Sequence, residues 1–458
     1  TSAGSGEVLD PKFKPNRSDE FDLTFQRQIT PAFSTEIGYT GRIIRNEYQA
    51  VDLDSVPTML TAGGQQFQNA FAQMYQQIAS GAAITKQPFF ETALGGTGTY
   101  CTGFSSCTAA VASNEVTNHN IDTTNGNNVY GLWQDLNNAD SWTLGRTFAS
   151  APTTCTAGTA GCPAGGLVSG GGQVSAIYDN SSIGFGNYNS LFWSLNMRNF
   201  HGVTAGSNFT WSKAMGTGQV DQATSEFGVT YPFDMHYMYG PQQNSSPVLY
   251  NAYAVWSPGP KEQNGLWGRL AHGWSFAPIV TWRRQGNTFY GNYGGLEQVG
   301  NGGQCSSFGE MDCGTGSTIE TAIMTGKYTG GSGIVRNSTY GNAAIANGGT
   351  GMERFSDPNK VMAGFRPIIL GVDTTGQSSY IPGLSVTNVD FSVTKHLNLA
   401  ERFSTDLNVV ATNVLNHFSA SSFGENINDA ADFGIITGNA LDAGSYNRQI
   451  EVGLLVRW

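Results

Sequence analysis

The chain ends with Gln449-Ile-Glu-Val-Gly-Leu-Leu-Val-Arg-Trp458, a stretch in which apolar and mostly polar side chains alternate. The apolar set is Ile450, Val452, Leu454, Val456 and Trp458. The other set is Gln449, Glu451, Gly453, Leu455 and Arg457. Successive side chains of a β-strand point to opposite faces, so this pattern predicts a strand with one apolar face.

Two interpretations of this strand are open. A half-buried strand of a soluble sandwich shows the same alternation. The closing strand of an outer-membrane β-barrel also does, because its outer face meets lipid and an aromatic residue marks the interface. The position of the pattern at the end of the chain, with Trp458 last, favours the barrel-closing strand.

Polarity in this chain comes mainly from neutral side chains. Asp, Glu, Lys and Arg make up 12% of the 458 residues, about half of the usual share in soluble domains. Glycine contributes 60 residues. Strands with a wet inner face and long irregular loops suit this composition. The formal net charge of −11 argues against nucleic acid as a partner.

No segment approaches the roughly 20 consecutive apolar residues of a transmembrane helix. Alternating strands cross a membrane without such a segment. The first residues, Thr1 to Glu7, are polar and lack the apolar core of a signal peptide. We therefore expect that a signal has been removed or that the chain begins within a longer polypeptide.

The cysteines form local couples: Cys101 with Cys107, Cys155 with Cys162, and Cys305 with Cys313. An even number at local spacing predicts disulfides in an oxidising compartment. A metal site is the alternative, but no histidine accompanies any couple at ligand spacing. We predict disulfides, no metal and no cofactor.

Alternation recurs in segments that are joined pairwise by short connections. The predicted strands are residues 18–29 and 37–43, 191–197 and 203–212, 247–256 and 274–282, and 389–394 and 403–412, followed by the closing strand. The hairpin around His201 is the clearest. Its apolar set, which includes Trp193, Phe209 and Trp211, is expected to face lipid.

Long intervals separate these pairs, at about 47–187, 216–246, 286–383 and 417–446, and they contain every cysteine. Bacterial outer-membrane barrels have short periplasmic turns and long extracellular loops, so we expect these intervals outside the cell. Residues 65–78 carry Phe67, Phe71, Met74 and Tyr75 at helical spacing. We predict a helix that packs on the core of its own loop, with a ligand or partner site as the alternative.

The pattern gives about nine spanning strands, with Phe365 to Asp373 as a weak tenth. Single-chain bacterial barrels have an even number of strands, and both chain ends lie in the periplasm. With nine strands, Thr1 would start outside the cell. We therefore expect residues 1–458 to be the C-terminal part of a longer barrel, or a fragment that needs a partner chain. A real tenth strand would remove this argument.

Several short motifs together resemble the Oar-like TonB-dependent outer-membrane transporters that are common in acidobacteria. The motifs are Asp10–Ser18, Gln87–Glu91, Tyr188–Leu191 through Phe209–Lys213, Asn413–His417, Phe433–Thr437 and Arg448–Ile450 with the closing strand. The resemblance implies an all-β, antiparallel up-and-down barrel of about 22 strands, an N-terminal plug and a TonB-contacting segment. Those N-terminal parts are absent from this sequence, and Trp458 stands where the family more often has Phe.

We find no catalytic constellation, and we expect that the protein is not an enzyme. The histidines, His119, His201, His236, His272, His396 and His417, are scattered and are expected to be solvated or to form hydrogen bonds. Gly170-Gly-Gly172 lacks the helix start and lysine of a phosphate loop.

Two further clusters have a plain and a sharper interpretation. Asp122, Asn125, Asn127 and Asn128 would suit Ca²⁺, but a simple turn is preferred. Arg283 and Arg284 end a strand, and we interpret them as anchors at the rim. The alternative is that one of them faces the lumen and attracts anions.

The preferred function is uptake of an unidentified substrate by the barrel of an energised transporter. Its partners would be outer-membrane lipid and, through the missing N-terminal part, the TonB complex. One alternative is a surface-exposed structural or adhesive barrel with disulfide-stapled loops. The other is a passive pore.

Overall fold

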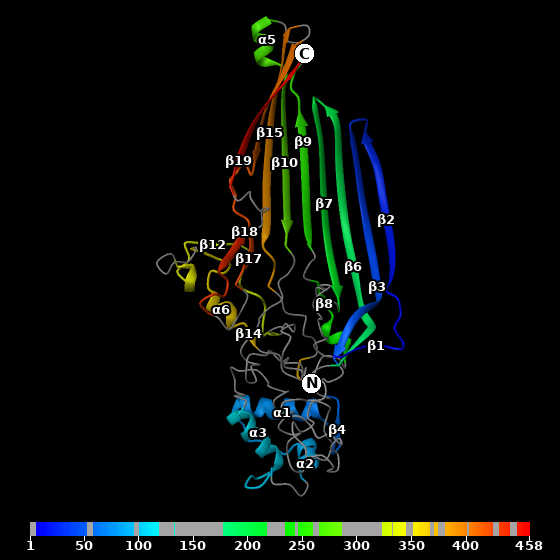
Figure 1. Ribbon diagram of the computed structural model, residues 1–458, viewed down its shortest axis with the longest axis vertical. Helices are drawn as coiled ribbons and strands as arrows, with labels where there is room; N and C mark the ends of the chain where they lie inside the picture. The colour runs from blue at the N-terminus through cyan, green and yellow to red at the C-terminus, as the bar shows by residue number, and fades with distance from the viewer. Residues whose placement is uncertain are drawn as a thin grey trace.

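The computed structural model describes residues 6–52, 58–95, 100–118, 132, 177–217, 234–242, 246–259, 265–285, 323–331, 333–344, 351–366, 371–373, 381–400, 403–424, 430–439 and 447–458. A single 11-stranded sheet dominates these residues (Figure 1). Its main path runs β19-β16-β15-β10-β9-β7-β6-β3-β2, and all neighbours on the path are antiparallel.

A long strand forms at every segment that the alternation predicts, and of the predicted residues only Pro247 and Trp458 lie just outside. They are β2 (Arg17–Thr30), β3 (Phe33–Asp52), β6 (Ile177–Phe200), β7 (Val203–Gly216), β9 (Val248–Trp256), β10 (Trp274–Arg284), β15 (Ser385–Ala400), β16 (Phe403–Thr412) and β19 (Gln449–Arg457). Two short strands complete the sheet: β1 (Gly6–Leu9) pairs in parallel with β6, and β8 (Gly240–Pro241) pairs with β7. The expected antiparallel sheet is confirmed.

The described sheet is open rather than closed into a barrel. Strands β2 and β19 lie at opposite ends of the path, and they do not pair with each other. The prediction that β19 closes a barrel is therefore not realised within the described residues. There, β19 is an edge strand that pairs only with β16.

Strand register gives the sheet one apolar face, because directly paired residues of neighbouring strands point to the same side. One row of paired residues on this apolar face is Phe25, Ile37, Trp193, Phe209, Tyr250 and Trp282. A second row on the same face is Phe276, Val393, Val409 and Val452. The alternation of separate segments thus adds up to one continuous apolar surface.

The opposite face of the sheet is the polar face. It is formed by the residues that alternate along each strand with those of the apolar face. Its directly paired residues include Gln26, Glu36, Ser194, Asn208, Asn251, Thr281 and Asn388. Neighbours in this row also bond to each other, since Gln26 Nε2 donates to Glu36 Oε2 at 2.9 Å. The polar face is therefore lined mainly by neutral hydrogen-bonding groups.

The apolar face is not packed into a protein core. Trp193 is 51% exposed, Val452 is 69% exposed and Phe209 is half-buried. In a soluble sandwich these side chains would be covered by a second sheet. Within the described residues, buried hydrophobic side chains gather instead in two lobes beyond one end of the sheet.

Connections are sorted by length between the two ends of the sheet (Figure 1). Strand pairs β2–β3, β6–β7, β9–β10 and β15–β16 turn at one end, which we call the turn end. The C-terminus also lies there. The long connections leave from the other end, the loop end. This sorting matches the predicted alternation of short and long connections.

The helical lobe lies furthest from the turn end (Figure 1). It contains α1 (Phe67–Ser80), α2 (Pro88–Leu94), α3 (Cys107–Asn118) and the hairpin of β4 (Thr61–Ala62) and β5 (Gln65–Gln66). The predicted helix is confirmed, since Phe67, Phe71, Met74 and Tyr75 of α1 are buried. Rings of α1 and α2 meet there, with 5.3 Å between the centroids of Phe67 and Phe89.

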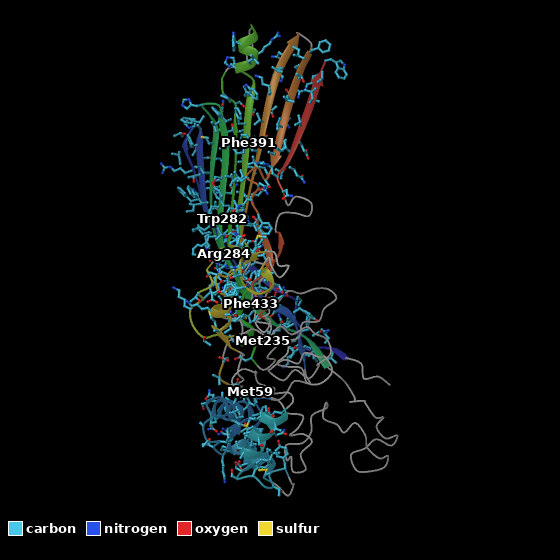
Figure 2. The ribbon with its side chains drawn as sticks, turned by 90° about the vertical axis from the view of Figure 1, so that its left-hand side faces the viewer. Met59, Met235, Trp282, Arg284, Phe391 and Phe433 are labelled. Carbon is cyan, nitrogen blue, oxygen red and sulfur yellow. A yellow bond between two sulfur atoms is a disulfide. The ribbon has the colours of Figure 1, made fainter. Side chains whose placement is uncertain are left out.

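A second lobe, the β-lobe, combines parts of two long connections. It contains β11 (Ile323–Met324), β12 (Val335–Arg336), β13 (Met352–Glu353), α6 (Pro358–Met362), β14 (Phe365–Arg366), β17 (Ala420–Phe423) and β18 (Ile436–Asn439). The buried rings of Phe355, Phe423 and Phe433 form its centre. In Figure 2, Phe433 lies beyond the end of the sheet that Trp282 and Arg284 mark, and Met59 lies further from the sheet still.

Two boundaries differ from the sequence pattern. Whether Phe365 to Asp373 is a tenth strand was left open by the sequence, and within the described part of this segment Phe365–Arg366 pairs with β11 inside the β-lobe and not with the large sheet. Strands β3 and β6 also run past the predicted ends at 47 and 187, as far as the pair Asp52 and Tyr178. Backbone pairing extends them through residues 178–182, which are mostly polar and do not alternate.

Three short helices remain: η2 (Met235–Met238) between β8 and its preceding strand β7, α5 (Gly265–Ala271) between β9 and β10, and η3 (Gly341–Ala343) between β12 and β13. Within the part of the chain that the structure describes, no helix combines the length and apolar character needed to cross a membrane.

Candidate functional site

At the turn end, the polar face carries an ionic cluster that joins the last three strands. Arg457 of β19 lies 2.8 Å from Asp406 of β16, between Nη2 and Oδ2. The other carboxylate oxygen, Oδ1, bonds to His396 Nδ1 of β15. His396 Nε2 lies 3.1 Å from Asn398 Oδ1. His396 therefore has a hydrogen-bonding role, and the cluster fastens the C-terminal strand to its neighbours.

Aromatic rings lie over glycines on the polar face. A Cβ on Gly38 would come within 2.3 Å of Phe192 Cζ, and one on Gly206 within 2.5 Å of Tyr253 Cε1. The rings thus occupy the space that side chains would fill at these positions, which shields the backbone of the strand. Tyr253 is 48% exposed, so this ring also presents an aromatic surface on the polar face.

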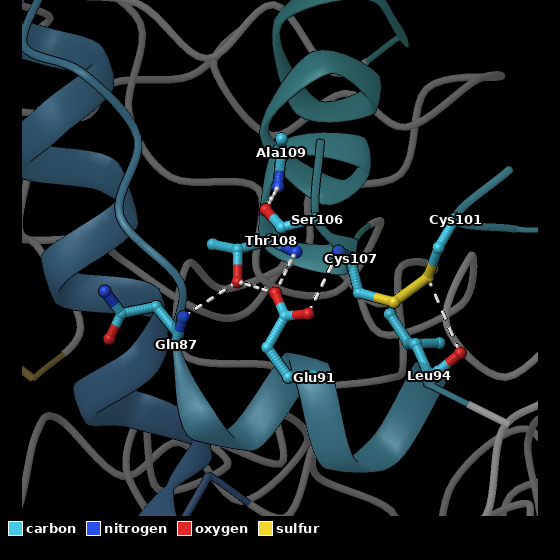
Figure 3. The surroundings of a disulfide bond; sticks show 8 residues. All are labelled: Gln87, Glu91, Leu94, Cys101, Ser106, Cys107, Thr108 and Ala109. Atoms are coloured by element: carbon cyan, nitrogen blue, oxygen red, sulfur yellow. Dashed lines mark hydrogen bonds between the residues drawn. A yellow bond between two sulfur atoms is a disulfide. The ribbon is translucent and has the colours of Figure 1, made fainter. Parts of the chain in front are cut away.

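The helical lobe is stapled where α2 meets α3 (Figure 3). Cys101 and Cys107 form a disulfide. Beside it, the carboxylate of Glu91 in α2 accepts hydrogen bonds from the backbone N–H groups of Thr108 at 2.9 Å and Cys107 at 3.3 Å. It also accepts one from Thr108 Oγ1 at 2.8 Å. Glu91 thereby caps the start of α3 and complements its dipole.

Replacing Glu91 with alanine should loosen α3. The change removes all three of these bonds, and we expect a loss of about 1–2 kcal/mol of local stability, the usual size for a lost cap. Glu91→Gln keeps one acceptor oxygen and should lose less. Hydrogen exchange of the amides in Cys107–Asn118 measures both changes. Equal protection in Glu91→Ala and the parent protein would rule out this capping role.

The β-lobe buries a complete arginine side chain. Arg354 is 1% exposed, and its guanidinium donates to three backbone carbonyls, those of Gly331 at 2.9 Å, Gly333 at 3.1 Å and Pro382 at 3.1 Å. Its Cζ lies 5.4 Å from the ring centroid of Phe355 and 6.0 Å from that of Phe423. A single side chain thus ties together three stretches of chain.

Glu353 lies beside it, with its side chain fully buried. Burial raises the pKa of this carboxyl from 4.5 to about 7, although bonds from the backbone N–H groups of Arg354 and Phe355 oppose the rise. A Cβ on Gly434 would overlap Glu353 Oε1, so only glycine leaves room for the carboxyl group.

The raised pKa predicts that the β-lobe is more stable in acid. The folded lobe holds a proton on Glu353 between pH 4.5 and about 7, whereas the unfolded chain has released it, so stability should fall as the pH rises through this window. Glu353→Gln should flatten the dependence. The proteolysis rate of the lobe, measured at pH 5 and pH 8, reports this pH dependence. If the dependence is the same in Glu353→Gln as in the parent protein, another group causes it.

The structure places most of the histidines in structural positions. His201 occupies the β6–β7 turn with a φ of 51°, and His236 bonds to Asp234 in η2. The backbone N–H of His417 donates to Asn413 Oδ1, which closes a turn. Among the described residues no group of His, Cys, Asp or Glu could hold a metal ion.

Several predicted positions lie outside the described residues. These are His119, Cys155, Cys162, Cys305, Cys313, Gly170–Gly172, and Asp122 with Asn125, Asn127 and Asn128. Arg283 and Arg284 are described at the loop end of β10. Register puts Arg283 on the polar face and Arg284 on the apolar side, so the pair is split between the faces.

Sequence reasoning missed Glu91 and Arg354. Glu91 lies in the Gln87–Glu91 motif, but its partners lie beyond it in the sequence, at Cys107 and Thr108. Arg354 sits in a short polar stretch with no periodic signal. Its acceptors come from separate segments that only the tertiary fold brings together.

One of three comparisons with known proteins identifies a family for this chain. A family model described as "Outer membrane beta barrel domain" matches residues 1–451. No curated protein matches. Among solved structures, the outer membrane transporter YddB from Escherichia coli is similar at a TM-score of 0.39 and 8% identity, over 100% of this chain and 34% of that chain. The chain thus belongs to the outer membrane beta barrel domain family, which places it in the outer membrane.

Proposed function

We propose that residues 1–458 form the C-terminal part of the barrel of an Oar-like TonB-dependent transporter. In this proposal the apolar face meets lipid, and the polar face lines the lumen. The sheet continues into a closed barrel with strands outside this sequence. A plug and a TonB-contacting segment, encoded upstream, gate it. The sequence motifs that resemble this family support the assignment.

One observation carries the proposal more than the others. The connections are sorted so that every long one leaves from the loop end, and two of the intervals build a lobe with its own packed core. Folded lobes at the mouth of a lumen suit capture of a large or scarce substrate. A passive pore has no need of them. The loop end would then face outward, and the turn end, with Trp458, would face the periplasm.

The first test uses the native protein. Its intact mass, measured on material from the outer membrane, should exceed the 48.8 kDa of this chain by the mass of a plug and further strands. A native mass equal to that of this chain would exclude the single-chain transporter.

The second test is uptake. Solutes depleted from the medium should be compared between the parent strain, a strain lacking this gene and a strain lacking TonB. Transport predicts that depletion of the same solute slows in both mutant strains. A strain that lacks the gene but depletes every solute as fast as the parent would contradict the proposal.

A structural or adhesive protein is the second candidate, and the disulfide-stapled helical lobe at the far tip favours it. This candidate predicts lost surface attachment in the deletion strain and no change in solute depletion. The passive pore predicts steady conductance of the purified protein in a planar bilayer without TonB.

A further inference from the structure

The β9–β10 connection carries a short helix at the turn end, where the other connections are tight turns. This helix, α5, has the sequence Gly-Leu-Trp-Gly-Arg-Leu-Ala over Gly265–Ala271. Trp267 is 80% exposed and Leu270 is 54% exposed, and the Arg269 side chain is exposed between them. A large aromatic and an aliphatic side chain thus point away from the protein next to a cation.

The end of α5 is held in place by Lys395 of β15. Lys395 Nζ donates to the carbonyl of Leu270 at 3.1 Å and also to that of His272. Trp274 Nε1 donates to the same Leu270 carbonyl at 2.9 Å, and Nζ lies 4.6 Å from the Trp274 ring centroid. The last carbonyls of a helix have no donor within the helix, and a cation there supplies one. These contacts therefore hold the end of α5 in place and form its seat.

Register shows on which side of the sheet this seat lies. Lys395 pairs directly with Trp274 and with Leu407, two positions along the strands from the apolar row of Phe276, Val393 and Val409. Side chains two apart on a strand share a face. Lys395 and the helix end that it binds therefore lie on the apolar side, and Lys395 itself is only 5% exposed.

Aromatic rings continue from this seat along the apolar face. The Trp274 and Phe276 centroids are 6.2 Å apart, and those of Trp256 and Phe276 are 5.5 Å apart. Rings of this kind gather where a membrane-spanning surface meets the head-group layer. Trp274, the ring of this row that bonds to the Leu270 carbonyl, joins the end of α5 to the row, at the rim of the face that a member of this family turns to lipid.

We propose that α5 is an interfacial anchor that lies in the head-group layer of the leaflet at the turn end. Trp267 and Leu270 enter the boundary between head groups and acyl chains, and Arg269 pairs with lipid phosphate. Lys395 is the positioning residue that holds the helix on the lipid side. This inference rests on family membership and on the register of the sheet, and it does not depend on transport.

The test measures the depth of Trp267 in the native protein, reconstituted in vesicles of phosphatidylethanolamine and phosphatidylglycerol. The lipids carry bromine either near the head group, at acyl carbons 6 and 7, or deeper, at carbons 11 and 12. The chain has nine tryptophans, so emission is compared between the parent and Trp267→Phe. We expect the variant to lose a component that shallow bromine quenches more strongly than deep bromine.

Two outcomes would overturn the anchor. If Trp267 lies in water, its removal raises the fraction of emission that brominated lipid quenches, and iodide in the buffer quenches the lost component. If Trp267 is seated in protein, the component lost in Trp267→Phe is one that neither brominated lipid nor iodide quenches, so the quenched fraction rises with both quenchers. Trp193→Phe is the matched control, since Trp193 lies in the middle of the apolar face and should lose a component quenched more by deep bromine.

The Lys395→Met variant tests whether Lys395 holds α5 at the lipid side of the sheet. It removes the bonds to the carbonyl of Leu270 in α5 and to that of His272 just after it, but keeps an apolar side chain on the apolar face. We expect Trp267 emission to become less sensitive to shallow bromine, because α5 loses its seat, while the component assigned to Trp193 stays unchanged. Unaltered quenching of Trp267 in Lys395→Met would remove the positioning role.

Discussion

Replacing Phe209 with lysine is expected to lower the free energy of unfolding in a bilayer by roughly 3–4 kcal/mol. The cost of a lysine on the lipid face of a barrel is about 2–4 kcal/mol near the midplane, and the lost contacts of the aromatic ring add to it. Phe209 lies in the middle of β7, in register with Trp193 and Tyr250 on the apolar face. Urea unfolding of the native protein in vesicles measures the change.

Asn208→Lys is the matched control. Asn208 is the neighbouring residue of the same strand, at the same depth, but its register partners are Ser194 and Asn251 on the polar face. A lysine there reaches water, so we expect a change of less than about 1 kcal/mol. Similar losses from both variants would show that the two faces do not differ in environment, and a larger loss from Asn208→Lys would invert their assignment.

Replacing Arg354 with alanine is expected to destabilise the β-lobe by roughly 3–5 kcal/mol. The carbonyls of Gly331, Gly333 and Pro382 lose their donors, and a cavity opens against Phe355. The sheet should stay folded, since none of these groups belongs to its strands. Hydrogen exchange is the measurement, followed at amides that cross the lobe, such as Arg354 to the Gly434 carbonyl.

Arg336→Ala provides the comparison within the same lobe. Arg336 lies in β12 with an exposed side chain, so its loss should change local stability by less than about 0.5 kcal/mol. Arg354→Lys should fall between the two, because an ammonium group cannot reach three carbonyls at once. Normal exchange of the lobe in Arg354→Ala would mean that the aromatic centre alone holds it together.

Much of the sheet follows from the sequence because alternation is local. Each segment from Phe21 to Trp458 shows which of its residues share a face, and neutral polar side chains mark the wet side. The helix α1 was predictable for the same reason, since Phe67, Phe71 and Met74 recur at its own spacing. The positions of short turns such as the one at His201 were also readable from the residues that flank them.

Other strand boundaries were not readable. Residues 178–182 carry Tyr, Asp, Asn and Ser and show no alternation, yet they belong to β6 because four of them pair with the backbone of β3. The possible tenth strand is the opposite case, because there the sequence suggests a strand of the large sheet and Phe365 pairs elsewhere. Phe365 is apolar because it belongs to the β-lobe core, and nothing in its neighbourhood separates that role from a place in the sheet.

The two-faced strands, the order of short and long connections and the helix in the first long interval are encoded locally, because each depends on neighbours along the chain. Four other features depend on the folded arrangement: two distant intervals share the β-lobe, Glu91 caps α3, Arg354 joins three segments, and Lys395 holds α5 on the apolar side. Each of these contacts depends on groups that approach one another only after the chain has folded.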